Sequence, residues 1–124
     1  SNPSKDIVDL GFVTEQEKRD AYAAATLFCQ PSKNESFSYV MMEAWLCGTP
    51  CLVHEACAVT RDHVVRSGGG LFFDSAVDFE GSVDLLLNDA DLRARMAASG
   101  RRYVLENFAW SRIVQRFREE VFRV

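Results

Sequence analysis

The chain has 124 residues, a formal net charge of -4, 48% hydrophobic residues and 26% charged residues. These values are typical of one modest globular domain rather than a disordered chain. The acidic balance argues against a surface that binds nucleic acid or an anionic membrane. No apolar run approaches the roughly 18 residues that a membrane-spanning helix needs.

Four short apolar runs are predicted to form strands. They are IVDL at 7–10, LFCQ at 27–30, CLVH at 51–54 and LFF at 71–73. Their nearly continuous apolarity, rather than an alternation of apolar and polar residues, favours strands that are buried on both faces. Such strands are typical of a parallel sheet that helices cover on either side.

Helices are predicted between and after these strands. Thr14 and Glu17 have the spacing of a capping box, which predicts a helix over 15–24. The other predicted helices cover 39–47, 59–66, 79–88, 90–107 and 110–122. The alternation of strands and helices predicts an α/β, Rossmann-like parallel sheet of about four strands, followed by a C-terminal run of helices.

The small number of strands bears on the domain organisation. An open sheet that binds nucleotides more often has about five or six strands, and the first predicted strand already begins at residue 7. We therefore expect residues 1–124 to be a single, partial domain whose opening strands lie outside the chain. Trp110, near the start of the last predicted helix, is expected to anchor that helix in the core.

The four cysteines are Cys29, Cys47, Cys51 and Cys57. They contain no C-x-x-C pair, so free thiols in a reducing cytosol are favoured over disulfides or a zinc site, and we expect a cytoplasmic protein. A metal cluster of His54, Cys57 and His63 is an alternative that lacks ordered zinc-ligand spacing.

Residues 31–50 contain the strongest candidates for a site. The loop PSKNESFS follows the second predicted strand, and ligands of open parallel sheets bind at the carboxyl edge of the strands. Ser38 is a candidate N-cap of the next helix, whose first backbone N–H groups lack intrahelical partners. These N–H groups belong to Tyr39, Val40 and Met41. A helix start of this kind can hold an anion such as a phosphate.

Two glutamates flank this helix start. Glu35 lies in the preceding loop, and Glu43 lies more than one turn inside an otherwise apolar helix. With a phosphate between them, Glu35 could face one end of an extended ligand and Glu43 the other. Carboxylates accept hydrogen bonds, which suits the hydroxyls of a sugar and a ribose. The alternative is that Glu43 points to solvent and Glu35 is a loop charge.

Four segments carry a family resemblance. They are GFV at 11–13, YAAATLFCQPSKNESFSYVMMEAWLCGTPCLV at 22–53, GGGLFF at 68–73 and ENFAWSRIVQRF at 106–117. Together they resemble the group 1 (family 4) glycosyltransferases. The most specific element is an E-x7-E motif, which Glu35 and Glu43 fill, with P-S before it and E-A-x-x-C-G-T-P at its end.

The resemblance implies a GT-B fold of two Rossmann-like domains and a retaining, hexosyltransferase-like enzyme. Such an enzyme moves a sugar from a nucleotide diphosphate sugar to an acceptor, which is unknown here. Residues 1–124 would be the donor-binding, C-terminal part, and this fragment would be inactive alone. The N-terminal acceptor domain, and the upstream arginine and lysine that bind the diphosphate, would lie outside the chain.

The motif also assigns roles to single residues. Glu35 would be the catalytic residue and would contact the donor sugar together with Phe37 and Ser38. Glu43 would hydrogen-bond the ribose hydroxyls. No metal or other cofactor is implied, because the departing diphosphate is stabilised by dipoles and cations alone.

The backbone N–H groups of Ser38, Tyr39 and Val40 would bind the diphosphate. This chain departs from the family at that point, because members commonly have E-G-F-G where it has E-S-F-S. Ser36 and Ser38 therefore replace glycines, and either would be strained if its backbone needed a positive φ.

The implied partners are the donor nucleotide sugar and the N-terminal domain of the same enzyme, with no nucleic acid. A membrane-associated acceptor remains open. A truncated sheet exposes an edge, so the isolated fragment is expected to dimerise. The rival class is a non-catalytic α/β module that senses nucleotides or binds proteins.

Overall fold

The sheet in the computed structural model, which describes residues 6–121, consists of three parallel strands in the order β1-β2-β3. The strands are β1 (Phe28–Gln30), β2 (Cys51–His54) and β3 (Gly70–Phe73). Helix α2 (Tyr39–Leu46) connects β1 to β2, and α3 (Ala58–Ser67) connects β2 to β3. The centre of the fold is therefore two successive βαβ units, as the predicted α/β class requires.

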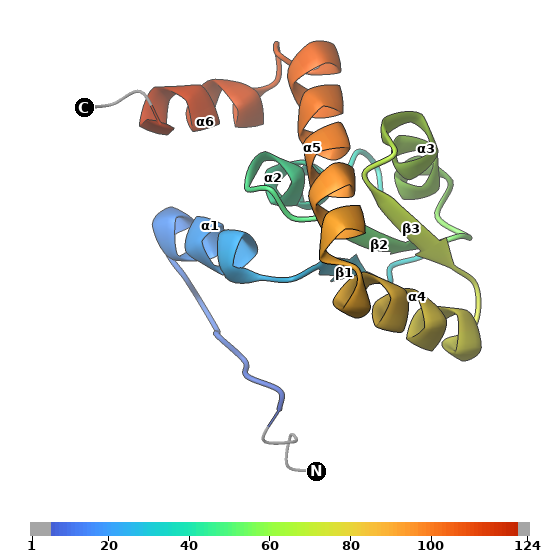
Figure 1. The fold of residues 1–124 in the computed structure, drawn as a ribbon. Helices are drawn as coiled ribbons and strands as arrows, with labels where there is room; N and C mark the ends of the chain where they lie inside the picture. The colour runs from blue at the N-terminus through green and yellow to red at the C-terminus, as the bar shows by residue number, and fades with distance from the viewer. Residues whose placement is uncertain (1–5, 122–124) are drawn as a thin grey trace.

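Four further helices surround this centre (Figure 1). They are α1 (Glu15–Ala24), α4 (Ala76–Asn88), α5 (Ala90–Asn107) and α6 (Arg112–Val121). The long helix α5 packs against both α2 and α3, while α1 and α6 pack against α2. The predicted helices are confirmed with small shifts of their ends, except that residue 122, the predicted end of the last helix, lies outside the described residues.

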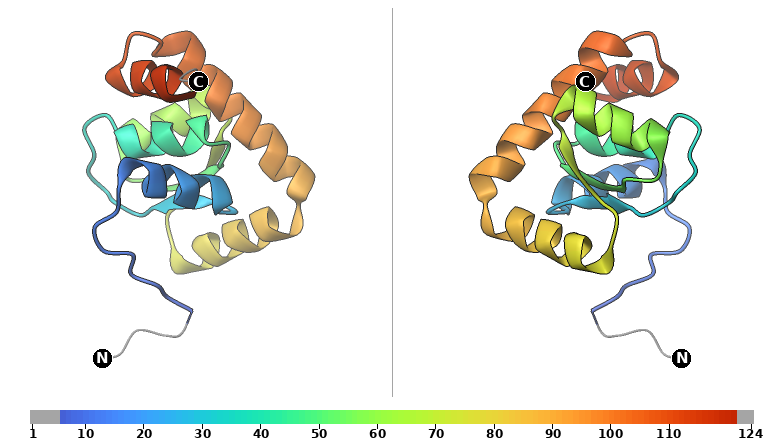
Figure 2. Two further views of the ribbon diagram at one scale, coloured as in Figure 1. Left: turned by 90° about the vertical axis from the view of Figure 1, so that its left-hand side faces the viewer. Right: turned by 90° about the vertical axis from the view of Figure 1, so that its right-hand side faces the viewer.

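The strand predicted at 7–10 is wrong. These residues have no regular structure, and the side chains of Ile7, Val8 and Leu10 are 66%, 74% and 61% exposed. Figure 2 shows in both views that the segment before α1 extends away from the sheet. A strand is stabilised by the backbone hydrogen bonds of a neighbour, and within residues 6–121 this segment has no neighbouring strand, which leaves three strands instead of about four.

Helix α1 begins where the capping box predicts. The Glu17 N–H donates to Thr14 Oγ1 at 3.1 Å, and the Thr14 N–H donates to Glu17 Oε1 at 3.0 Å. Further along the chain, Tyr22 of α1 contributes a backbone carbonyl that accepts a hydrogen bond from the Thr49 hydroxyl, just after α2. The start of α1 and its position against α2 are therefore both fixed by hydrogen bonds.

The core centres on Trp45 of α2, which is fully buried. Its indole N–H donates to the backbone carbonyl of Gly69 at 2.9 Å. A Cβ atom added at Gly69 would lie 2.5 Å from Trp45 Nε1, and one added at Gly100 of α5 would also collide with the indole. Glycine is needed at both positions because α5 and the start of β3 approach the Trp45 ring so closely.

The predicted anchoring role of Trp110 is also wrong. Its side chain is 71% exposed, and its indole N–H donates to the carbonyl of Asn107 at 3.2 Å. Phe108 occupies the core side of the α5–α6 connection instead, where it packs against the buried cluster. Of these two nearby aromatic residues, only Phe108 faces inward. No helix among the described residues combines the length and apolarity needed to cross a membrane.

Candidate functional site

The loop over residues 31–38 begins at the carboxyl end of β1, and its last residue lies beside that same end of the strand. The Ser38 hydroxyl donates to Gln30 Oε1 at 2.7 Å, and both residues are buried. This bond ties the last residue of the loop to the last residue of the strand. The start of α2 therefore lies at the carboxyl edge of the sheet, where the sequence predicts it.

Ser38 is the N-cap of α2, as predicted, but its side chain does not cap the helix. Its hydroxyl is engaged with Gln30, so the first backbone N–H groups of α2 receive no hydrogen-bond acceptor from it. The backbone has φ 67° and ψ 66°, and Ser38 alone among the described non-glycine residues has a positive φ. The strain expected for a serine in place of glycine is therefore present at Ser38, while Ser36 has no positive φ.

The residue before Ser38 is fixed by an aromatic cluster of Phe37, His63, Tyr103 and Phe108. The Phe37 ring centroid lies 5.2 Å from that of Phe108 and 5.7 Å from that of His63. Helices α3 and α5 contribute His63 and Tyr103, so the cluster ties the loop to two helices. The donor-sugar contact of Phe37 stays a prediction, since this packing alone accounts for an aromatic residue at the position.

His63 connects the cluster to the backbone of the loop. Its Nδ1 lies 2.8 Å from the Tyr103 hydroxyl, and the ring also hydrogen-bonds the backbone of Phe37. Burial lowers the pKa of His63, although the carboxylate of Asp62 and the Phe37 backbone oppose that shift. A neutral imidazole can donate to one of these partners and accept from the other, which holds the loop in place beside the helix start.

Glu35 lines an open hollow of about 500 Å³. The lining is formed by residues 33–36 of the loop and residues 56–59, which lead from β2 into α3. The side chain of Glu35 is half-buried, and it makes no hydrogen bond or ion pair within residues 6–121. Its carboxylate is therefore available to accept hydrogen bonds from a ligand in this hollow.

Glu43 has a partner that the sequence does not reveal. The Lys18 ammonium group of α1 lies 3.0 Å from Glu43 Oε2 and 3.2 Å from Glu15 Oε2. Burial lowers the pKa of Lys18, but its hydrogen bonds to Glu43 and Glu15 outweigh burial and raise the pKa above its ordinary value. The alternative that Glu43 simply points to solvent is wrong, because its side chain is only 18% exposed and is paired.

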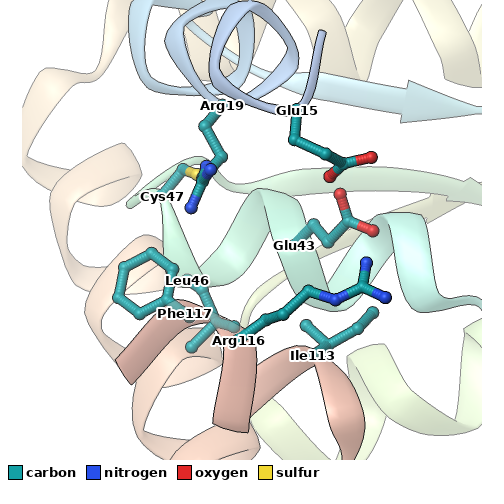
Figure 3. A pocket seen from close by; sticks show the side chains of 8 residues that line it. All are labelled: Glu15, Arg19, Glu43, Leu46, Cys47, Ile113, Arg116 and Phe117. Carbon is teal, nitrogen blue, oxygen red and sulfur yellow. The ribbon is translucent and has the colours of Figure 1, made fainter. Parts of the chain in front are cut away.

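A small pocket lies beside Glu43, between α1, α2 and α6 (Figure 3). Its residues are Glu15, Arg19, Glu43, Leu46, Cys47, Ile113, Arg116 and Phe117. The pocket measures about 40 Å³, against about 500 Å³ for the hollow beside Glu35. Glu35 and Glu43 therefore border two different hollows, and the structure does not bring them together in one pocket.

The predicted free thiols are confirmed, since all four cysteines are unpaired. Burial raises the pKa of the Cys51 thiol well above its ordinary value and also raises that of Cys29. In the part of the chain that the structure describes, no group of three or more His, Cys, Asp or Glu side chains is placed to hold a metal ion. His54 instead accepts the Ala56 N–H at Nδ1, at 3.0 Å.

Sequence reasoning missed Lys18, Gln30 and His63 as partners of the site. Gln30 is the residue for which a signal existed, because the last residue of a strand before a binding loop faces the site edge. Lys18 and His63 act across helices, and no local pattern indicates which residues of a neighbouring helix they will meet. The contact between His63 and Tyr103, for example, spans 40 residues of sequence.

The chain has relatives among known proteins. The family model described as glycosyl transferases group 1 matches residues 2–103. The chain is 38% identical over 96 residues to a D-inositol 3-phosphate glycosyltransferase of Salinispora tropica, a match that covers 76% of this chain and 20% of that protein. A protein of the same name from Streptomyces bingchenggensis is 33% identical over 102 residues, which are 80% of this chain and 22% of that protein.

The fold has a counterpart among solved structures. A sucrose-phosphate synthase from Thermosynechococcus elongatus superimposes with a TM-score of 0.74 and 24% identity, over 90% of this chain and 28% of that one. This likeness concerns the fold alone. The chain spans about a fifth of the length of the curated relatives named above.

Proposed function

Because the chain belongs to the group 1 glycosyltransferases, we propose that it is the donor-binding part of a retaining sugar-transferring enzyme. The donor would be a nucleotide diphosphate sugar. The acceptor domain and the remaining cations of the site would come from outside residues 1–124, so we expect the isolated chain to be inactive. Such an enzyme would combine this domain with a second one that brings the acceptor.

The observation that carries the proposal is the start of α2 at the carboxyl edge of the sheet. The Ser38 hydroxyl is engaged with Gln30, which leaves the N–H groups of the first helical turn for a ligand. These groups and the helix dipole favour an anion. We place the diphosphate there, on the backbone N–H groups of Ser38, Tyr39 and Val40.

The two glutamates would bind the two hydroxyl-bearing ends of the donor. Glu35 borders a hollow of about 500 Å³ that has room for a sugar, and its carboxylate has no partner among residues 6–121. Glu43, one turn inside α2, would accept hydrogen bonds from the ribose. Because its own pocket is small, the ribose would lie over the carboxylate from the side of the helix start rather than inside that pocket.

For a retaining enzyme, we expect the following transfer step. The bond between the anomeric carbon and the β-phosphate oxygen breaks, and the acceptor hydroxyl forms a new bond to the same face of that carbon. The acceptor proton passes to the departing phosphate oxygen, so the products are a glycoside and a nucleoside diphosphate. The first turn of α2 would stabilise the charge that gathers on the diphosphate, and we expect no metal to be needed for this step.

The proposal is tested by titrating UDP and GDP into the full-length protein that carries this chain and measuring the heat of binding. We expect Glu43→Gln to weaken binding of the preferred nucleotide about tenfold or more, because it removes a charged acceptor of ribose hydroxyls. Glu80→Gln, an exposed position on α4, serves as the matched control. Unchanged affinity in Glu43→Gln would contradict the ribose role of Glu43, and no binding of either nucleotide by the unmodified protein would favour a non-catalytic module that binds proteins.

A further inference from the structure

We propose that Lys18 is a positioning residue for the Glu43 carboxylate and, through it, for recognition of the donor ribose. The inference rests on the proposed function, because it assigns Glu43 to the ribose. It gives the contact between α1 and α2 a role in nucleotide affinity.

The geometry of the ion pair is close and partly shielded from solvent. Lys18 Nζ lies 3.0 Å from Glu43 Oε2, and the two side chains are 29% and 18% exposed. Partial burial strengthens such a pair relative to one on an open surface, where screening by water dominates. Among the residues that the structure describes, Lys18 is the side chain that pairs with the Glu43 carboxylate.

The position of Lys18 is itself determined by its surroundings. The Lys18 N–H donates to the carbonyl of Thr14 at 2.9 Å, so Lys18 belongs to the first hydrogen-bonded turn after the capping box. Helix α1 is in turn attached to the segment after α2 by the hydrogen bond between Thr49 and Tyr22. Lys18 therefore approaches Glu43 from a helix that is fixed at its start and held against α2.

Glu15 gives the ammonium group of Lys18 a second partner. Its carboxylate and that of Glu43 border the same small pocket, and Figure 3 shows them close together and directed toward one another. Two like charges at short range repel, and Lys18 contacts both of them. Arg19 and Arg116 also line the pocket, but Lys18 is the cation paired with both carboxylates, so its loss would leave the orientation of Glu43 less fixed.

This arrangement leaves part of Glu43 for a ligand. Lys18 contacts Oε2, and a carboxylate has further lone pairs, on Oε1 in particular, that can accept ribose hydroxyls. A carboxylate already held in its binding orientation loses less conformational entropy when the ligand binds. Lys18 would therefore raise nucleotide affinity without contacting the nucleotide.

The test measures binding of UDP and GDP by calorimetry in the full-length protein. We expect Lys18→Met to weaken binding of the preferred nucleotide about three- to tenfold, the range of one partly shielded ion pair. Lys18→Arg, which keeps the charge, should restore affinity to within about twofold of the unmodified protein. Should Lys18→Met melt below the assay temperature, Lys18→Gln replaces it with the same expected result.

A ribose analogue distinguishes positioning from a general structural effect. The 2′,3′-dideoxy form of the preferred diphosphate lacks the hydroxyls that Glu43 would bind, so Lys18→Met should not weaken its binding. The double variant Lys18→Met, Glu43→Gln should bind the ordinary nucleotide no more weakly than Glu43→Gln alone. An equal loss for both forms of the nucleotide would mean that Lys18 acts on the fold, and the inference would be overturned.

The matched control is Arg95→Met, which removes an ion pair of 3.1 Å with Asp91 on the exposed face of α5. It should leave nucleotide affinity unchanged. Normal affinity in Lys18→Met together with weakened affinity in Glu43→Gln would overturn this inference and leave the proposed function intact. Normal affinity in both would instead remove Glu43 from the ribose site, and the proposed function with it.

Discussion

The two glutamates of the E-x7-E motif lie in unlike surroundings. Glu43 projects from a helix whose other side is buried in the core, and Lys18 holds its carboxylate at 3.0 Å beside a pocket of about 40 Å³. Glu35 lies in a loop, borders a hollow of about 500 Å³, and makes no hydrogen bond or ion pair within residues 6–121. One carboxylate is anchored and the other is unpaired.

This difference is consistent with the two proposed roles, ribose binding by Glu43 and donor-sugar binding by Glu35. The ribose is the same in every ribonucleotide donor, so a carboxylate fixed in one orientation can recognise it at a low entropic cost. The sugar changes position relative to the diphosphate as the glycosidic bond breaks. A carboxylate without a protein partner can accept hydrogen bonds from that sugar alone. If these hydrogen bonds are stronger in the transition state than in the bound donor, they raise the rate of transfer.

The largest effect is expected from a substitution of Trp45, which anchors in the core the helix that carries Glu43. Trp45→Ala removes a fully buried indole and its hydrogen bond to Gly69, and should lower the free energy of unfolding by about 3–5 kcal/mol. Urea unfolding followed by circular dichroism measures it. Trp110→Ala is the matched control, because a side chain that is 71% exposed should contribute less than about 0.5 kcal/mol. Similar losses in both variants would mean that the core is not centred on α2.

The next largest effect is expected on catalysis, and it distinguishes the role of Glu35 from that of Glu43. Glu35→Gln keeps the size of the side chain but removes its charge, and should lower the rate of sugar transfer by about 100-fold. Affinity for UDP or GDP should stay within about twofold, because Glu35 lies on the sugar side of the helix start. Initial rates with a donor sugar and binding heats in the full-length protein measure the two quantities. A loss of nucleotide affinity with normal transfer would reverse the roles of the two glutamates.

The features of the fold and the site that the sequence predicts are those determined by residues close to one another along the chain. The capping box at Thr14 and the start of α2 at Ser38 are set by residues within one turn, and both are confirmed. The motif likewise identifies both glutamates from a fixed spacing. These features need no knowledge of which elements meet in space.

The remaining features depend on long-range contacts. Apolar residues at 7–10 predict a strand, but a strand also needs a neighbour to pair with, and none lies beside them among the described residues. Phe108 and Trp110 are both large aromatics, and only the packing against α2 and α3 decides which one faces inward. The partner of Glu43 lies 25 positions earlier, on a different helix, so its apolar neighbours in sequence could not reveal it.

A smaller effect is expected where Ser38 replaces the glycine of the family pattern. Ser38→Ala loses the hydrogen bond to the buried Gln30 and keeps the positive φ, so it should destabilise the fold by about 1–2 kcal/mol. Ser38→Gly loses the same bond but relieves the strained backbone, and should differ from the unmodified protein by less than about 1 kcal/mol. Urea unfolding compares them, with Ser36→Ala as the control for an exposed serine. Equal destabilisation by alanine and glycine would show that the backbone at Ser38 carries no strain.

The smallest effect is a pH dependence of stability from His63, which holds the loop beside the unpaired glutamate. Burial lowers the pKa of His63 below its ordinary value of 6.5, so the unfolded chain binds this proton more tightly than the folded one. Its contribution is therefore present above the unfolded pKa and is lost as the pH falls through 6.5 toward the folded pKa. The melting temperature should fall by roughly a few degrees between pH 7.5 and pH 5.5, as calorimetry can measure. His63→Gln should flatten this dependence, because an amide does not titrate and can still hydrogen-bond Tyr103 or the Phe37 backbone. An unchanged slope in His63→Gln would assign the pH dependence of stability to other titrating groups.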